Sequence, residues 1–173
     1  AFDGAGGMNA HAYEAAYEPH MGGCHGCHVR CKKEGKGGER LPEFETMSHF
    51  SALLENERLD VVVRANEICN EAGMDTISAG ATLACHAELE GVRFGADQVL
   101  ALFADLAAAR GVGADLAEGA RAYASARGVP GAAMAVKGLE LPAYDPRGAY
   151  GMALGFAVST RGGCHLRAYP VAN

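Results

Sequence analysis

Three cysteines within eight residues, Cys24, Cys27 and Cys31, constrain this chain more than any other feature of its sequence. The first two form a Cys-x-x-Cys clamp, and the glycines around them permit a tight backbone turn. Thiolates on one loop are the usual ligands of iron–sulfur clusters. The spacing therefore predicts a metal centre, with an iron–sulfur cluster as the main interpretation and a fourth ligand supplied from elsewhere.

The same segment is compatible with two other metal centres. Residues 24–28 read Cys-His-Gly-Cys-His, which matches the attachment pattern of c-type haem, with His28 as the axial iron ligand. A structural zinc ion could bind the three cysteines together with His25 or His28, because three cysteines and one histidine are a common zinc ligand set. Disulfides are less favoured, because a chain of 173 residues can bury a core without them.

Charge and hydropathy exclude two classes of partner. The formal net charge is −6 at pH 7, which gives no general attraction to nucleic acid phosphates or to anionic lipids. Charges such as Asp105, Arg110 and Asp115 interrupt the Ala-rich stretches, so no apolar run approaches the roughly 20 residues that a membrane-spanning helix requires. We therefore expect no nucleic acid partner and no membrane insertion.

The spacing of the apolar residues and the glycines at the expected helix ends predict a mainly α fold, a multihelical array with irregular Gly/Pro-rich loops. Helices are expected over 9–17, over 46–73 with a break near 56–60, from 75 or 78 to 91, over 96–110, over 114–127, and from Pro146 through residue 157. The rest of the opening segment up to Gly23 and residues 32–42 are expected to be loops, and residues 136–141 a short extended piece. No repeat or linker marks a domain boundary.

The other three cysteines need separate interpretations. Cys69 and Cys85 fall on apolar faces of predicted helices, where free cysteine is usually part of the core. Cys164 follows two glycines and precedes His165, and its role stays open.

Five segments together resemble the tungsten-dependent aldehyde:ferredoxin oxidoreductase family. They are GCHGCHVRC at 23–31, LPEFET at 41–46, NEAGMDTISAGATLA at 70–84, VKGLELPAYDPRG at 136–148 and STRGGCHLRA at 159–168. They occur in the family's order and cover nearly the whole chain. The resemblance implies helical domains that clasp a tungsten (or molybdenum) bis-pterin cofactor, with a [4Fe-4S] cluster nearby.

The resemblance also implies which residues hold the cluster. Cys24, Cys27 and Cys31 match three clustered ligands of the family, whose fourth cysteine lies in an Asp-x-x-Gly-Leu-Cys motif that does not occur before Asn173. We therefore expect residues 1–173 to be the helical iron–sulfur and pterin-cofactor-binding region of a larger enzyme. Such a fragment would lack the N-terminal pterin domain and the C-terminal end, and would be inactive alone.

Four further residues match positions at the family's active site. Glu43 and Glu45 in PEFET match the region of a catalytic glutamate, and Glu45 is preferred as the proton acceptor. His165 matches an active-site histidine that can donate a hydrogen bond to a metal oxo group or to a substrate oxygen. Asp75 matches an aspartate that contacts the pterin, and it could equally be a helix N-cap.

The function implied by the resemblance is oxidation of an aldehyde with water to a carboxylic acid, with electrons passed through the cluster to ferredoxin. An anaerobic cytoplasmic setting follows, because reduced tungsten and such a cluster tolerate oxygen poorly. The implied partners are ferredoxin and the aldehyde, and a homodimer and partner subunits both remain open. The alternative is a c-type haem electron-transfer protein, because His28 completes the Cys-His-Gly-Cys-His attachment pattern.

Overall fold

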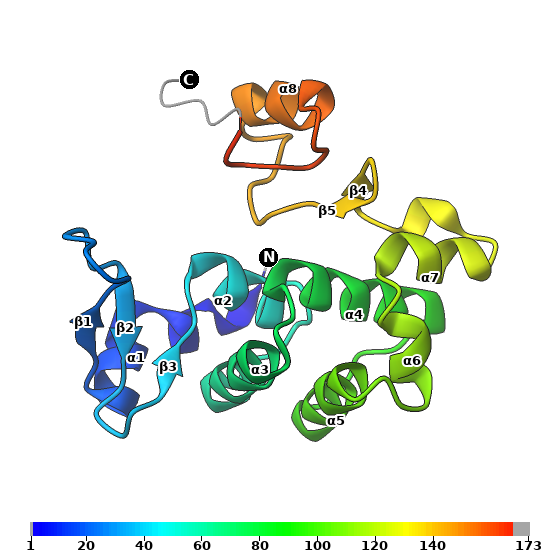
Figure 1. Cartoon of the computed structure of the whole chain (residues 1–173). Helices are drawn as coiled ribbons and strands as arrows, with labels where there is room; N and C mark the ends of the chain where they lie inside the picture. Colours follow the sequence, from blue (N-terminus) through cyan, green and yellow to red (C-terminus); the bar gives the residue numbers. More distant parts are fainter. Residues whose placement is uncertain (1, 168–173) are drawn as a thin grey trace.

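The computed structural model describes residues 2–167 and is mainly helical, which confirms the multihelical class (Figure 1). The helices are η1 (Asp3–Met8), α1 (Ala10–Tyr17), α2 (Phe44–Phe50), α3 (Leu59–Ala72), α4 (Thr76–Glu90), α5 (Ala96–Ala107), α6 (Val112–Leu116), α7 (Ala120–Ala126), η2 (Pro130–Ala132) and α8 (Tyr150–Val158). The strands are β1 (His20–Gly22), β2 (Lys32–Glu34), β3 (Arg40–Leu41), β4 (Ala135–Val136) and β5 (Leu139–Glu140).

Helices α2 to α7 share one hydrophobic core, in which α3 packs against α5 and α4 packs against α2 and α7. Val62 and Ala65 of α3 and Phe50 of α2 are fully buried there. The rings of Phe50 and Phe103 meet with their centroids 4.4 Å apart, which joins α2 to α5. This core supports the two helices, α2 and α4, whose first turns carry predicted site residues.

The helix boundaries near the site follow local sequence signals. The Asp75 side chain caps α4, because its Oδ1 accepts a hydrogen bond from the Ser78 backbone N–H at 2.8 Å. Gly73 ends α3 in the left-handed conformation, with φ of 69°. In the middle of α4, a Cβ added at Gly80 would lie 2.7 Å from the Cβ of His49. Glycine at this position therefore permits the close contact between α2 and α4.

The prediction of one helix over 114–127 was wrong. Two short helices, α6 and α7, occupy this region, because Gly119 takes a positive φ of 86° that interrupts the helix. The buried side chain of Glu140 then accepts from the Ala120 backbone N–H at 3.2 Å and from the Ser78 hydroxyl at 2.8 Å. Helix α5 also ends at Ala107, before the predicted 110, and α8 begins at Tyr150 rather than at Pro146.

The segments around the cysteines form a small sheet where loops were expected. Strands β1, β2 and β3 are antiparallel, with His20 opposite Glu34 and Gly22 opposite Lys32. The exposed charged residues of β2 give no apolar alternation that would have predicted a strand. The three clustered cysteines lie on the loop that connects β1 to β2.

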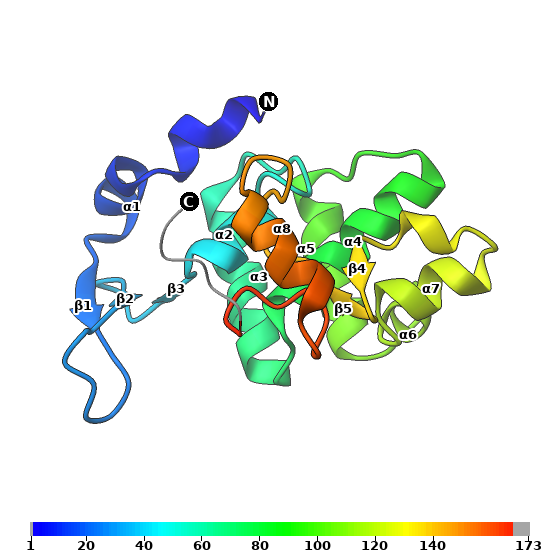
Figure 2. The ribbon, with the colours of Figure 1, turned by 90° about the horizontal axis from the view of Figure 1, so that it is seen from above.

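The C-terminal part of the described chain returns over the helical array. A hairpin of β4 and β5, which confirms the expected extended piece, leads into a loop and then into α8. Figure 1 shows α8 on the side of α2 and α4 away from α3 and α5, and in Figure 2, seen from above, α8 lies in front of the helical array. Within residues 2–167, no helix is long and apolar enough to cross a bilayer.

Stability should fall in mild acid because of His86. Its Nδ1 lies 2.6 Å from the Tyr123 hydroxyl, and burial lowers the pKa of His86 from its ordinary value of 6.5. The unfolded chain therefore takes up this proton more readily, so the stabilisation is complete above pH 6.5 and is lost as pH falls through the lowered pKa. We expect His86→Asn to flatten the loss of unfolding free energy between about pH 7 and about pH 5 in denaturant titrations.

The exposed His11 gives the control, because His11→Asn should leave the slope of stability against pH as it is in the unmodified chain. An equal slope in the His86→Asn chain and the unmodified chain would contradict the assignment of a neutral buried ring.

Candidate functional site

A cavity of about 780 Å³ lies between the three-stranded sheet and the first turns of α2 and α4. Its wall also includes residues from α3 and from the segment that follows α8. Four predicted site residues line it: Glu43, Glu45, Asp75 and His165. Residues that are up to 122 positions apart in the sequence therefore face one space.

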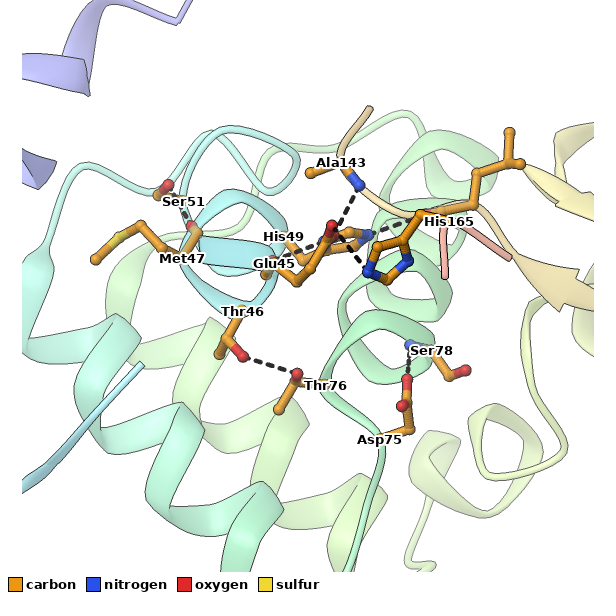
Figure 3. A network of polar contacts seen from close by, with 11 residues as sticks. Glu45, Thr46, Met47, His49, Ser51, Asp75, Thr76, Ser78, Ala143 and His165 are labelled. Carbon is orange, nitrogen blue, oxygen red and sulfur yellow. Dashed lines mark hydrogen bonds and ion pairs between the residues drawn. The ribbon is translucent and has the colours of Figure 1, made fainter. Parts of the chain in front are cut away.

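Glu45 is the most closely surrounded of the four residues (Figure 3). The backbone N–H of Ala143 donates a hydrogen bond to its Oε2 at 2.8 Å. On the other side, its Oε1 lies 3.8 Å from Nε2 of His165, and Oε2 also lies 3.8 Å from Nδ1 of His49. The carboxylate is thus held by one backbone donor and flanked by two histidines.

One oxygen of Glu45 has no hydrogen-bond donor within the described chain. Oε1 is buried and makes no hydrogen bond, and the 3.8 Å separation from His165 is too long for one. A buried carboxylate oxygen without a donor is costly. Oε1 is therefore free to accept a proton or an N–H or O–H group from a molecule in the cavity.

Aromatic stacking orients His165. The ring of Tyr144 stacks on the imidazole, with centroids 5.7 Å apart and an interplanar angle of 29°. Phe44 packs on Tyr144 in turn, at a centroid distance of 6.0 Å. The loop that supplies the backbone donor to Glu45 therefore also fixes the imidazole beside it.

Asp75 and Glu43 occupy different positions on the cavity wall. Asp75 uses Oδ1 to cap α4, and a carboxylate has a second oxygen that can serve a ligand. Glu43 precedes α2, is exposed, and makes no capping hydrogen bond with its side chain. Glu45, rather than Glu43, lies next to His165.

The cysteine loop is exposed, and two hydrogen bonds within the segment close it. Cys24, Cys27 and Cys31 are all exposed free thiols, and the Cys27 N–H donates to the Cys24 carbonyl at 3.0 Å. The Arg30 guanidinium donates to the Met21 carbonyl at 2.6 Å, across the base of the loop. In residues 2–167 no three His, Cys, Asp or Glu side chains are arranged to hold a metal ion. The donor chemistry fits a cluster, but the thiols would have to draw together around it.

The remaining cysteines are buried, which confirms the core positions of Cys69 and Cys85. Burial raises the pKa of Cys69 to about 12, so it stays a neutral thiol. Cys164 is different: although burial opposes ionisation, the backbone N–H groups of Leu166 and Arg167 hold the pKa of its thiol below the ordinary value.

Comparison with known proteins identifies the family. The sequence profile described as aldehyde ferredoxin oxidoreductase, domains 2 & 3, matches residues 1–173. The chain belongs to the aldehyde ferredoxin oxidoreductase family. It is 38% identical to the tungsten-containing aldehyde ferredoxin oxidoreductase of Pyrococcus furiosus over an alignment of 168 positions, which covers 86% of this chain and 28% of the relative.

A second tungsten-containing aldehyde ferredoxin oxidoreductase, from Thermococcus kodakarensis, is 36% identical over an alignment of 192 positions, which covers 96% of this chain and 32% of the relative. The enzyme of the same name from Pyrococcus abyssi is 37% identical over an alignment of 170 positions, which covers 86% of this chain and 28% of the relative. The chain thus spans between 28% and 32% of the length of these relatives and corresponds to a part of a family enzyme.

Three residues at the site were not predicted: His49, Ala143 and Tyr144. Sequence carried a signal for only one of them, because His49 follows Glu45 by four positions and therefore lies on the same helix face. Ala143 contributes a backbone N–H, which leaves no trace in side-chain chemistry.

Removing the α4 cap should destabilise the chain without changing its fold. Asp75→Ala deletes the acceptor for the Ser78 N–H, and loss of such a cap costs about 0.5–2 kcal/mol of unfolding free energy. Urea titration followed by far-UV circular dichroism measures this loss. The matched control is Glu88→Ala, an exposed acid later on α4. Equal stabilities of the two variants would contradict a capping role.

Proposed function

We propose that this chain is part of a tungsten (or molybdenum) bis-pterin enzyme that oxidises an aldehyde with water to a carboxylic acid and passes electrons through a [4Fe-4S] cluster to ferredoxin. The observation that carries this proposal is the shared cavity, whose wall joins Glu45, Asp75 and His165 to Gly23, the residue before Cys24. The relatives are named as tungsten-containing aldehyde ferredoxin oxidoreductases, which supports the proposal. When bound, the pterin-held metal supplies the two-electron redox chemistry.

Glu45 is the proposed proton acceptor. Its Oε2 accepts from the Ala143 N–H, whereas its buried Oε1 has no donor among residues 2–167, and both Glu45 and His165 line the cavity. A carboxylate fixed in this way can take a proton from the water that attacks the aldehyde. His165 is proposed to donate from Nε2 to the oxygen on which negative charge develops.

The rest of the cavity wall suits a large anionic cofactor. Asp75 can accept hydrogen bonds from the amino and ring N–H groups of a pterin while it caps α4. Lys32, Lys33 and Arg40 line the same cavity, although the whole chain is acidic. Their charges suit the phosphate groups of a pterin cofactor.

The cluster is proposed to form on the loop between β1 and β2. Cys24, Cys27 and Cys31 would supply three thiolates, and the fourth ligand would come from outside this loop. Because Gly22 and Gly23 belong to the cavity wall, the loop lies beside the proposed redox site. Ferredoxin as electron acceptor and an anaerobic cytoplasmic setting stay predictions of this proposal.

The cluster assignment predicts a selective loss of iron. In the whole enzyme that contains this chain, purified without oxygen, Cys27→Ala should remove the bound iron and the broad visible absorption of the cluster. Cys85→Ala, at a buried thiol, should retain both. A sharp Soret band that survives denaturation would instead establish covalent haem and overturn the assignment.

The assignment of Glu45 predicts a selective loss of catalysis. Glu45→Gln keeps the side-chain size but removes the proton acceptor, so aldehyde oxidation should fall by about 10²–10⁴-fold at unchanged tungsten and iron content. The matched control is Glu43→Gln, two residues earlier and exposed, which should leave most activity. An inactive Glu43→Gln enzyme beside an active Glu45→Gln enzyme would reverse the assignment.

A further inference from the structure

His49 is the second histidine beside Glu45, and its surroundings differ from those of His165. It lies in the last turn of α2, where it is only 3% exposed. Its Nδ1 lies 2.8 Å from the backbone oxygen of Glu45, and its Nε2 lies 3.1 Å from the backbone oxygen of Leu141. Both ring nitrogens therefore face carbonyl oxygens, which can only accept hydrogen bonds.

A neutral imidazole cannot satisfy this arrangement. It carries one N–H and one lone pair, so one of the two carbonyl oxygens would face a lone pair at hydrogen-bond distance. An imidazolium donates at both nitrogens and satisfies both oxygens. A buried cation needs a counter-charge, and the Oε2 atom of Glu45 lies 3.8 Å from Nδ1.

We propose that His49 is held as an imidazolium and acts as a positioning residue, which fixes the Glu45 carboxylate against the 141–143 segment. Its two N–H groups tie the main chain of α2 to the main chain at Leu141. Two residues later, Ala143 donates to the same carboxylate. The effect of this positioning on catalysis rests on the proposed role of Glu45. The protonation state of His49 is independent of that role.

The other groups packed around His49 are consistent with a single counter-charge. Helix α4 contributes Gly80, where any Cβ would lie 2.7 Å from the His49 Cβ and push the ring away. The loop after Leu141 carries Asp145 and Arg147, which pair with each other at 2.7 Å and so add no net charge. His165 approaches Oε1, the other oxygen of Glu45.

A second buried histidine gives an internal comparison. Among residues 2–167, His86 has only one polar partner within hydrogen-bond distance, the Tyr123 hydroxyl at 2.6 Å from Nδ1, and the Glu90 carboxylate lies 3.9 Å from the same nitrogen. A hydroxyl can donate, so a neutral ring satisfies this contact, and burial lowers the pKa of His86. The two buried rings should therefore be in opposite protonation states in the same sample.

The test is the ¹⁵N NMR spectrum of the full 173-residue chain labelled at histidine, at about pH 7.5, where an unperturbed histidine is mostly neutral. The signals are assigned by their loss in His49→Gln and in His86→Gln. We expect both ring nitrogens of His49 to carry protons, and His86 to show one protonated and one bare nitrogen. One bare nitrogen on His49 in the folded chain would overturn the proposal.

The counter-charge is tested by Glu45→Gln in the same measurement. Without the carboxylate, His49 should lose one ring proton at about pH 7.5, and the unchanged His86 signals should show that the fold is retained. If His49 stays doubly protonated in this variant, its pairing with Glu45 is wrong. These spectra need no metal, so their outcome is separate from the outcome of the aldehyde oxidation assay.

Discussion

The hydrogen bond from the Ala143 backbone N–H to the Glu45 carboxylate holds together segments that lie 98 residues apart in the sequence. Helix α2 has only seven residues, too few to be stable by local propensity, so its position depends on such tertiary contacts. The same loop carries Tyr144, which orients His165 by stacking. Without this bond, Glu45 would be an ordinary acid in the first turn of a short helix.

The cavity combines two unlike structural parts. The helical side is built on a packed core that includes the fully buried Phe50 and Phe103, and Asp75 caps α4 beside the cavity. The sheet side is small and polar, and it presents exposed thiols beside the basic residues of β2. This division suits a site in which the helices fix the reacting groups while the sheet carries groups for electron transfer and for an anionic ligand.

Local features of the fold could be predicted from sequence, because each depends on a few neighbouring residues. Asp75 caps α4 and Cys69 is buried, as expected. The β1–β2–β3 sheet and the break at Gly119 could not be predicted, since they depend on strand pairing and on a capping contact from Glu140. These are interactions between distant segments.

The site was predictable in part. Resemblance pointed to Glu45, Asp75 and His165, and the structure brings all three to one cavity. The donor from Ala143 and the two carbonyl contacts of His49 involve the backbone, so no residue pattern reveals them. For the cysteines, spacing indicates the ligand chemistry, while the geometry around a metal depends on how the loop closes.

The most direct test of the shared site is anomalous X-ray diffraction from crystals of the whole enzyme at the tungsten and iron absorption edges. We expect a tungsten peak inside the cavity, beside Glu45 and His165, and an iron peak at the loop of Cys24, Cys27 and Cys31. A tungsten peak outside this cavity, or iron bound away from the cysteine loop, would contradict it.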